Sequence, residues 1–387
     1  MRPTDSKGAP QVVIVGAGAA GLSAGGALKR LGVEATILDK DDRIGGSWAR
    51  RYERLHLHTV RRFSGLAHHP IPRSYPRYVP KDQYAGYLEQ YAEALRLRVE
   101  LSRPVRAVRP GDDGLWETVS EEGERWLAPV VVIATGHYNE PVVPRWPGLD
   151  DYTGRVVHSR DYASGRDFAG EDVLVVGIGN SGAEIAADLV EQGASRVAIA
   201  VRTSPPIMPR DLFGLVPVQL LGIALTPVPA PRLLDRAGAL ARRVAIGDLS
   251  RYGLGKAEWG PFTARRPAVI DVGFLKHLKS VTIDVRLAPE RFTADGVVFA
   301  DGRKESFGAV IAATGFDTGL RRLLDVPDAV KDDGRPRFRS GRPTPHSGLY
   351  FIGFDETTRG VLFEARRDSL RLARAVRRYL DKRATPA

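Results

Sequence analysis

Two glycine-rich turns of the same form, one in each half of the 387-residue chain, constrain its fold more than any other feature. Each follows a short apolar run and opens a stretch of small residues that is typical of a helix. The first turn contains Gly16, Gly18 and Gly21, and the second contains Gly177, Gly179, Asn180, Ser181 and Gly182. In a strand–turn–helix unit these glycines allow a tight turn, approach of the backbone to a pyrophosphate, and packing of the helix on the strand. The helix N-terminus attracts the phosphates. The two turns therefore predict a chain that binds two dinucleotides.

The residues that end the next apolar segments predict which dinucleotide binds at each turn. After the first turn, the segment VEATIL leads to Asp39. An acidic side chain at this place accepts hydrogen bonds from ribose hydroxyls, as in NAD and FAD sites. After the second turn, the segment RVAIAV leads to Arg202, whose guanidinium suits a 2′-phosphate. We therefore predict FAD at the first turn and NADPH at the second. The alternative is that Arg202 is a solvated strand-end residue of an arginine-rich chain.

Composition excludes several classes of function. The chain has no cysteine, so it forms no disulfide, no thiolate metal site and no Cys-x-x-Cys redox relay. Its eight histidines lack metal-ligand spacing, and no metal is expected. The net charge of +11 comes from scattered arginines without a nucleic-acid-binding motif, so nucleic acid is not a predicted partner. No signal peptide and no membrane-spanning apolar run is recognisable, and we expect a cytoplasmic protein.

The order of the segments predicts an α/β protein with two Rossmann-like dinucleotide-binding domains. The segments VVVIATG (130–136) and AVIAATG (309–315) are predicted as matching buried parallel strands, whose carboxyl ends face a ligand crevice. Apolar spacing predicts a helix from Lys81 to Arg96 and a basic amphipathic helix from Glu364 onward. We expect a discontinuous FAD domain, residues 1–150 and 308–387, with the NADPH domain inserted as residues 151–307. The two nucleotides would then face each other across one interdomain cleft.

Further motifs accompany the two turns along nearly the whole chain. They are GGSW (45–48), YERLHLHT (52–59), YTGRVVHSRDY (152–162), VVGIGNSG (175–182) and ATGF (313–316). Together with the turns, these motifs resemble the class B flavin-dependent monooxygenases, and within them the YUCCA-like branch. The segment between the turns is the most diagnostic, because Tyr152, Gly154, His158 and Tyr162 match the family pattern F-x-G-x-x-x-H-x-x-x-Y. Tyr152 replaces the usual Phe. The absence of Trp-Pro after Tyr162 is unlike the Baeyer–Villiger branch.

The resemblance implies a reaction and a set of binding residues. NADPH reduces FAD, dioxygen adds to the flavin C4a carbon, and the resulting (hydro)peroxide transfers one oxygen atom to a small organic substrate. FAD is expected to contact Gly16, Gly18, Gly21, Asp39, Lys40, Gly46, Trp48 and Val105. NADPH is expected to contact Gly177, Gly179, Asn180, Ser181, Gly182 and Arg202. His58 lies where YUCCA enzymes carry a histidine near the flavin, and a neutral imidazole there would donate a hydrogen bond to the peroxide or to NADP. A packed histidine without catalytic function is the alternative. His158 is expected to orient the interdomain linker.

The residues named above are compatible with more than one type of oxygenation. N- or S-oxygenation, oxidative decarboxylation of a 2-oxo acid and Baeyer–Villiger insertion differ in the protonation state of the oxygenating group, which the sequence does not reveal. The segment from Leu349 to Ser369 departs from the plant YUCCA pattern, so the substrate pocket is expected to differ. Two other functions share many of these features. One is a flavin oxidase or reductase that releases hydrogen peroxide, and the other is a non-catalytic protein that senses dinucleotides.

Overall fold

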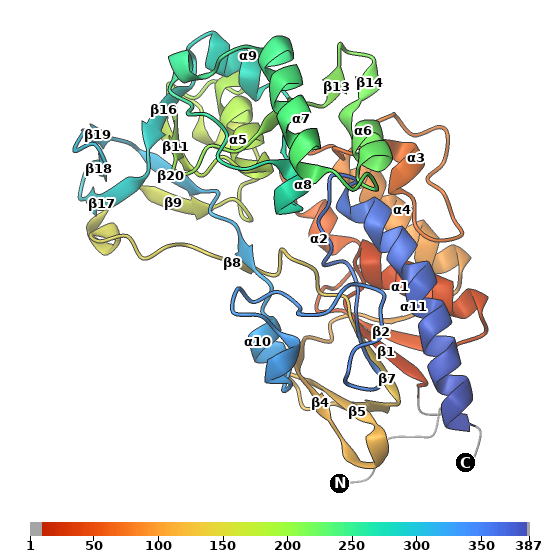
Figure 1. The fold of residues 1–387 in the computed structure, drawn as a ribbon. Coiled ribbons are helices and arrows are strands. Elements are labelled where there is room, and N and C mark those ends of the chain that lie inside the picture. The colour runs from red at the N-terminus through yellow and green to blue at the C-terminus, as the bar shows by residue number, and fades with distance from the viewer. Residues whose placement is uncertain (1–9, 385–387) are drawn as a thin grey trace.

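Two five-stranded parallel sheets organise the chain, as the computed structural model of residues 10–384 shows (Figure 1). The strand order of the first sheet is β22-β7-β1-β2-β3, and all its neighbouring strands are parallel. Its strands are β1 (Val12–Val15), β2 (Ala35–Leu38), β3 (Arg98–Glu100), β7 (Val130–Ile133) and β22 (Leu349–Phe351). The central strands β1 and β7 are buried at every position, as expected for apolar runs covered on both faces.

The second sheet repeats the plan of the first. Its order is β16-β11-β10-β20-β9, again with parallel neighbours throughout. Its strands are β9 (Arg155–His158), β10 (Asp172–Val176), β11 (Arg196–Val201), β16 (Asp284–Leu287) and β20 (Ala309–Ala312). In both sheets the central strand leads into a glycine turn and lies between its second strand and a strand that ends at Ala-Thr-Gly. The predicted duplication and the α/β fold class with two Rossmann-like halves are confirmed.

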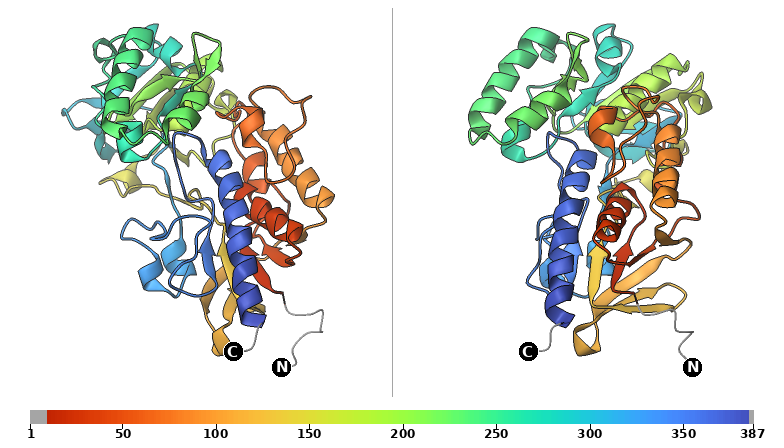
Figure 2. Two further views of the ribbon diagram at one scale, coloured as in Figure 1. Left: turned by 45° about the vertical axis from the view of Figure 1, so that its right-hand side comes forward. Right: turned by 90° about the vertical axis from the view of Figure 1, so that its right-hand side faces the viewer.

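Helices and small antiparallel sheets surround the two parallel sheets. Around the first lie α1 (Ala19–Arg30), α2 (Gly46–Ala49), α3 (Arg61–Ser64), α4 (Lys81–Ala94), α10 (Leu320–Leu323), α11 (Val361–Ala384), and the sheet of β4 (Val105–Pro110), β5 (Trp116–Ser120) and β6 (Arg125–Ala128). Around the second lie α5 (Asn180–Glu191), α9 (Phe274–Lys279), and the sheet of β17 (Pro289–Thr293), β18 (Gly296–Phe299) and β19 (Lys304–Ser306). The predicted helices appear as α4 and α11. Helix α11 packs along α1 (Figure 2).

A separate group of short elements follows β11. It comprises β12 (Ile207–Pro209), β13 (Asp211–Leu212), β14 (Val216–Pro217), α6 (Val218–Leu225), α7 (Pro231–Ile246), α8 (Pro261–Ala264) and β15 (Val269–Asp271). Parallel pairing of β12 with β15 closes this group next to α5. Among the helices of residues 10–384, none has the length and apolar character needed to cross a membrane.

The chain passes between the two sheets twice. It leaves the first sheet after β7 and returns to it as β22, and the two connections pair as the short strands β8 (Glu140–Pro141) and β21 (Phe316–Asp317). The predicted boundary at residue 308 is wrong at one strand, because β20 pairs with β10 and β9 in the second sheet. The return to the first half therefore begins after residue 312. The remaining domain division stays a prediction.

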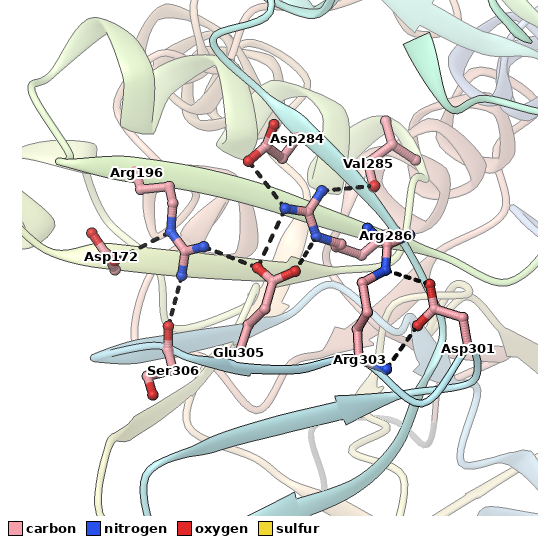
Figure 3. A network of polar contacts seen from close by, with 9 residues as sticks. All are labelled: Asp172, Arg196, Asp284, Val285, Arg286, Asp301, Arg303, Glu305 and Ser306. Carbon is pink, nitrogen blue, oxygen red and sulfur yellow. Dashed lines mark hydrogen bonds and ion pairs between the residues drawn. The ribbon is translucent and has the colours of Figure 1, made fainter. Parts of the chain in front are cut away.

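A network of charged side chains joins the second sheet to its small antiparallel sheet (Figure 3). Glu305 of β19 accepts hydrogen bonds from Arg286 Nε at 2.5 Å and from Arg196 Nη1 at 2.9 Å. Arg196 and Arg286 also contact Asp172 and Asp284. Burial opposes ionisation of Glu305, but the hydrogen bonds and charges of the two arginines outweigh it and lower its pKa. One carboxylate thus connects β11, β16 and β19.

Replacing Glu305 with glutamine should lower the free energy of unfolding by about 2 kcal/mol, because two charge-assisted hydrogen bonds lose their acceptor charge. The folded-state pKa of Glu305 lies below its ordinary value of 4.5. Its contribution is therefore present above that value and is lost as the pH falls through the folded-state pKa. Urea unfolding of both proteins between pH 7 and pH 3 should show their difference shrinking below about pH 4.5.

The exposed pair of Asp301 and Arg303 provides the control for this prediction (Figure 3). It joins residues of one turn, so the Asp301→Asn variant should unfold almost as the parent protein does. An equal loss of stability in both variants would show that the network has no special role.

Candidate dinucleotide sites

The first and third glycines of the two turns have the same structural role. Gly16 and Gly177 adopt φ angles of +111° and +107°, which glycine tolerates and other residues rarely adopt. A Cβ atom on Gly21 would lie 1.8 Å from the carbonyl oxygen of Gly16, and one on Gly182 would lie 2.0 Å from that of Gly177. These four glycines are therefore required by the fold itself.

The middle glycines have a different role. Gly18 and Gly179 adopt φ angles of −73° and −76°, which any residue can adopt. A Cβ atom on either one would meet no atom within 4 Å. The absence of a side chain therefore serves neither backbone conformation nor packing within the described chain. It leaves open space at the start of α1 and α5, which is where a pyrophosphate approaches such a turn.

Other features of the turns fit a dinucleotide as well. Neither α1 nor α5 has a side-chain hydrogen bond at its N-cap, so no side chain occupies the place of a phosphate there. Beside the first turn, the hydroxyl oxygen of Thr135 is buried and has no hydrogen-bond partner within residues 10–384. Thr135 follows Ala134, whose carbonyl oxygen lies 2.7 Å from where a Cβ of Gly16 would be. An unsatisfied buried hydroxyl at a turn edge is expected where a ligand completes the site.

Asp39 lies directly after β2 and is held against the first turn. Its carboxylate accepts hydrogen bonds from the backbone N–H groups of Ala17 and Asp41. Burial raises the pKa of Asp39, and the two backbone hydrogen bonds oppose this effect. Lys40 points elsewhere, since its Nζ donates to Asn139 Oδ1 at 2.7 Å. The structure thus brings Asp39 to the first turn, and contact of both residues with a ribose stays a prediction.

Strand register reveals which residue of the second half corresponds to Asp39. The N–H of Gly16 donates to the carbonyl of Leu38, and the N–H of Gly177 donates to that of Ala200. Leu38 and Ala200 are therefore equivalent, so Val201 occupies the place of Asp39 and Arg202 the place of Lys40. An acidic residue at the position of Asp39 would repel a 2′-phosphate. In the second half this position is the uncharged Val201. Arg202 itself is exposed.

Two polar residues of the second turn contact protein groups. Asn180 Oδ1 accepts a hydrogen bond from the backbone N–H of Ile270 at 2.7 Å, which attaches β15 to the start of α5. The Ser181 side chain lies near the Tyr52 hydroxyl. The sequence pattern did not reveal either contact, because both partners lie far away along the chain. Binding of NADPH by these two side chains stays a prediction.

The remaining predicted FAD residues lie along the first half. Gly46 opens α2, where a Cβ would lie 2.8 Å from Asp41 Oδ2. The ring of Trp48 meets Tyr84 edge to face at a centroid distance of 4.7 Å. Val105 begins β4 and pairs with Ser120. The structure does not bring Val105 into contact with the turn, and the contacts of all three with flavin or adenine stay predictions.

His58 has a protein partner that the sequence did not predict. Its Nε2 bonds Oε1 of Glu184, a carboxylate of α5 that is only 2% exposed. Because a carboxylate only accepts hydrogen bonds, Nε2 carries the proton. A neutral imidazole held in this way presents Nδ1 as an acceptor, so the predicted donation toward a ligand requires a second proton. Glu184 lies two residues after the last glycine of the turn, and only the tertiary packing reveals its role.

The diagnostic segment between the turns is structural. The Tyr152 hydroxyl donates to the carbonyl of Phe307 at 2.7 Å, and the Tyr162 hydroxyl donates to Asp188 Oδ2 at 2.6 Å. His158 Nδ1 accepts from the N–H of Arg160, so its Nε2 donates to the carbonyl of Gly315 at 3.0 Å. Burial lowers the pKa of His158, in agreement with a neutral ring. This histidine therefore fixes the second connection next to β21, as expected for a residue that orients the linker.

Known proteins similar to this chain agree with these features. The family described as pyridine nucleotide-disulphide oxidoreductase matches residues 13–210. The indole-3-pyruvate monooxygenase YUCCA1 of Oryza sativa subsp. japonica is 39% identical over 368 residues, which cover 91% of this chain and 88% of the relative. A variant of the flavin monooxygenase from Stenotrophomonas maltophilia has a TM-score of 0.74 and 26% identity, covering 96% of this chain and 99% of its own. OTEMO in complex with FAD and NADP has a TM-score of 0.73 at 17% identity, covering 97% and 86%, and shares the fold.

The fold, the paired turns and these similarities define an oxidoreductase of the flavin monooxygenase class. The chain belongs to the family that includes the plant YUCCA monooxygenases. The predicted enzyme class is confirmed, and FAD and NADP, the predicted cofactors, are those of the OTEMO complex. The wider family name refers to disulfides, but this chain has no cysteine and cannot carry a redox-active dithiol.

Proposed function

We propose that the chain binds FAD at the first turn and NADPH at the second, and that it oxidatively decarboxylates a small 2-oxo acid with dioxygen. The observation that carries the two-site proposal is the pair of middle glycines. Gly18 and Gly179 leave open space at two uncapped helix starts, and neither glycine is needed for the fold. Open space of this kind at both turns supports the proposal that two dinucleotides bind, each with its pyrophosphate at the start of one helix.

The residues next to each turn support the order of the two cofactors. Asp39 offers a carboxylate to ribose hydroxyls at the first turn, where a 2′-phosphate would be repelled. Val201 and Arg202 offer an uncharged position followed by an exposed guanidinium at the second turn. Bound FAD, once reduced by NADPH, supplies the reaction with dioxygen, and the protein supplies orientation and exclusion of water. His58 contributes to orientation: it holds a proton on Nε2 and presents Nδ1 as a hydrogen-bond acceptor.

The substrate class is inferred from the relatives. The rice relative is named for indole-3-pyruvate, a 2-oxo acid, and it is 39% identical to this chain. The net charge of +11 is compatible with an anionic substrate. The Stenotrophomonas neighbour is named only as a flavin monooxygenase, which leaves N- or S-oxygenation as the second candidate. Baeyer–Villiger insertion has weaker support, since the neighbours of that type share only the fold.

The test measures coupling of NADPH consumption to product. The purified, FAD-loaded protein is mixed with NADPH and dioxygen in the presence of indole-3-pyruvate, phenylpyruvate, a tertiary amine, a thioether or cyclohexanone. We expect carbon dioxide and the shortened acid from a 2-oxo acid, with little hydrogen peroxide. If product formed only from the amine or the thioether, the reaction would be heteroatom oxygenation, and the proposal of a 2-oxo acid substrate would be wrong. Hydrogen peroxide in every reaction would indicate an oxidase, and failure of NADPH to bleach the flavin without oxygen would contradict the two-site proposal.

A further inference from the structure

The segment from Tyr52 to His58 follows the first turn in sequence but is attached to the second half. Tyr52 is 3% exposed and belongs to the apolar core of that half, where its ring meets Tyr162 edge to face. The N–H of Glu53 donates to the carbonyl of Ala163 at 2.9 Å. Arg54 forms an ion pair with Glu191 of α5 at 2.9 Å. Leu57 and Leu55 of the same segment also hydrogen-bond Val79 and Lys81 of the first half, so the segment connects that half to α5, the helix at whose start we place the second dinucleotide.

Glu184 lies at the centre of this attachment. Its carboxylate is 2% exposed, accepts a hydrogen bond from His58 Nε2, and lies near the Tyr52 hydroxyl. Near the same hydroxyl lies Ser181, which belongs to the glycine turn itself. Burial raises the pKa of Tyr52 well above its ordinary value, and the charge of Glu184 raises it further. Tyr52 therefore keeps its hydroxyl proton beside the buried carboxylate.

This arrangement leaves one polar atom of His58 unused by the protein. Nε2 is committed to Glu184, and Nδ1 has no hydrogen-bond partner within the described chain. The side chain of His58 is 20% exposed, so the ring is not fully enclosed by the protein. A buried carboxylate that fixes one nitrogen of an imidazole also fixes which nitrogen faces a ligand, as in other sites where a carboxylate orients a histidine.

We propose that Glu184 is a positioning residue of the NADPH site: it holds His58 in the Nε2-protonated form and directs Nδ1 toward the bound dinucleotide. The proposal rests on the function proposed above for the second turn. In this role Glu184 acts through His58 and does not itself contact the substrate. Ser181, Tyr52, Glu184 and His58 then form one group of neighbouring polar side chains between the turn and the first half of the molecule.

The test compares Glu184→Gln with Glu191→Gln. Both carboxylates lie on α5 and both bind the segment from Tyr52 to His58, but Glu191 is 41% exposed and bonds Arg54. In the Glu184→Gln variant the acceptor charge is lost and one oxygen is replaced by an amide donor, so the hydrogen bond that holds His58 Nε2 weakens. We expect the dissociation constant for NADP⁺, measured by calorimetry on FAD-loaded protein, to rise about tenfold in Glu184→Gln. It should change less than about twofold in Glu191→Gln, whose pair is solvent-exposed.

A second measurement examines His58 without any dinucleotide. The ¹⁵N chemical shifts of its imidazole, assigned by comparison with a His58→Asn variant, should report a proton on Nε2 in the parent protein and in Glu191→Gln. In Glu184→Gln that preference should be lost, while Glu184→Asp should retain it in part. FAD content and the midpoint of thermal unfolding should stay near the parent values in Glu184→Gln, which separates positioning from a loss of fold.

The two measurements distinguish the proposal from the function on which it rests. An unchanged Nε2 proton in Glu184→Gln would overturn the role of Glu184, whatever the protein binds. A lost Nε2 preference with unchanged NADP⁺ affinity would also overturn it, because His58 would then not act on the dinucleotide. Absence of NADP⁺ binding in the parent protein would refute the function proposed for the second turn and, with it, the direction assigned to Nδ1.

Discussion

A Gly179→Val variant should retain FAD and its fold but lose reduction of the flavin by NADPH. The φ angle of Gly179 is accessible to valine, and no atom of the described chain lies within 4 Å of the position of its Cβ. The added side chain would instead occupy the space into which we place the NADPH pyrophosphate. We expect the rate of anaerobic flavin reduction at a fixed NADPH concentration to fall at least about 100-fold. Stopped-flow absorbance of the flavin band measures this rate.

The Gly18→Val variant is the matched counterpart in the first half. The two glycines share nearly the same backbone angles and the same open surroundings, so steric damage to the fold should be equally small in both. Gly18→Val should purify with little FAD, whereas Gly179→Val should purify with a full complement. A control that should unfold is Gly182→Ala, since its Cβ would lie 2.0 Å from a carbonyl oxygen. If instead Gly179→Val purified without FAD, and Gly18→Val kept FAD but lost its reduction by NADPH, the order of the two sites would be reversed.

The repeated scaffold could be predicted from the sequence because it depends on local signals. Apolar runs, glycine spacing and Ala-Thr-Gly strand ends are each visible within a few residues, and the structure places both copies of the strand ending at Ala-Thr-Gly beside a glycine-turn strand. The boundary at residue 308 was predicted wrongly for a physical reason. Membership of β20 in one sheet or the other depends on strand pairing between distant segments, and the two strands look alike in sequence.

The partners of the candidate site residues could not be predicted in the same way. His58 meets Glu184 across 126 positions of the chain, and Asn180 meets Ile270 across 90. The first contact joins the two halves, and the second joins β15 to the start of α5 within the second half. The number of residues after each glycine turn did not reveal that Arg202 corresponds to Lys40. Arg202 lies further along the chain from the second turn than Lys40 does from the first. Strand register resolved it, since hydrogen bonds from Gly16 and Gly177 identify Leu38 and Ala200 as the common reference.

An Arg202→Glu variant should reverse the preference of the enzyme between NADPH and NADH. We expect Arg202 to bind the 2′-phosphate that distinguishes these cofactors, with Val201 leaving the neighbouring position uncharged. Glutamate would replace a charge-assisted hydrogen bond with repulsion of the phosphate. The kcat/KM for NADPH should therefore fall about 100-fold or more, a loss of about 3 kcal/mol of transition-state stabilisation, while the value for NADH should change little.

The Lys40→Glu variant, with rates expressed per bound FAD because Lys40 lies at the predicted FAD site, tests whether this effect belongs to the second turn. Lys40 is the structural equivalent of Arg202 in the first half, and its change from positive to negative charge alters the net charge of the protein by the same amount. A general electrostatic effect on an anionic cofactor would appear in both variants, because long-range attraction depends on the overall charge. A local contact with the 2′-phosphate would appear only in Arg202→Glu. Equal losses for NADPH and NADH in Arg202→Glu would indicate that Arg202 binds a group common to both cofactors, such as the pyrophosphate, and the assignment of NADPH would then lose its structural basis.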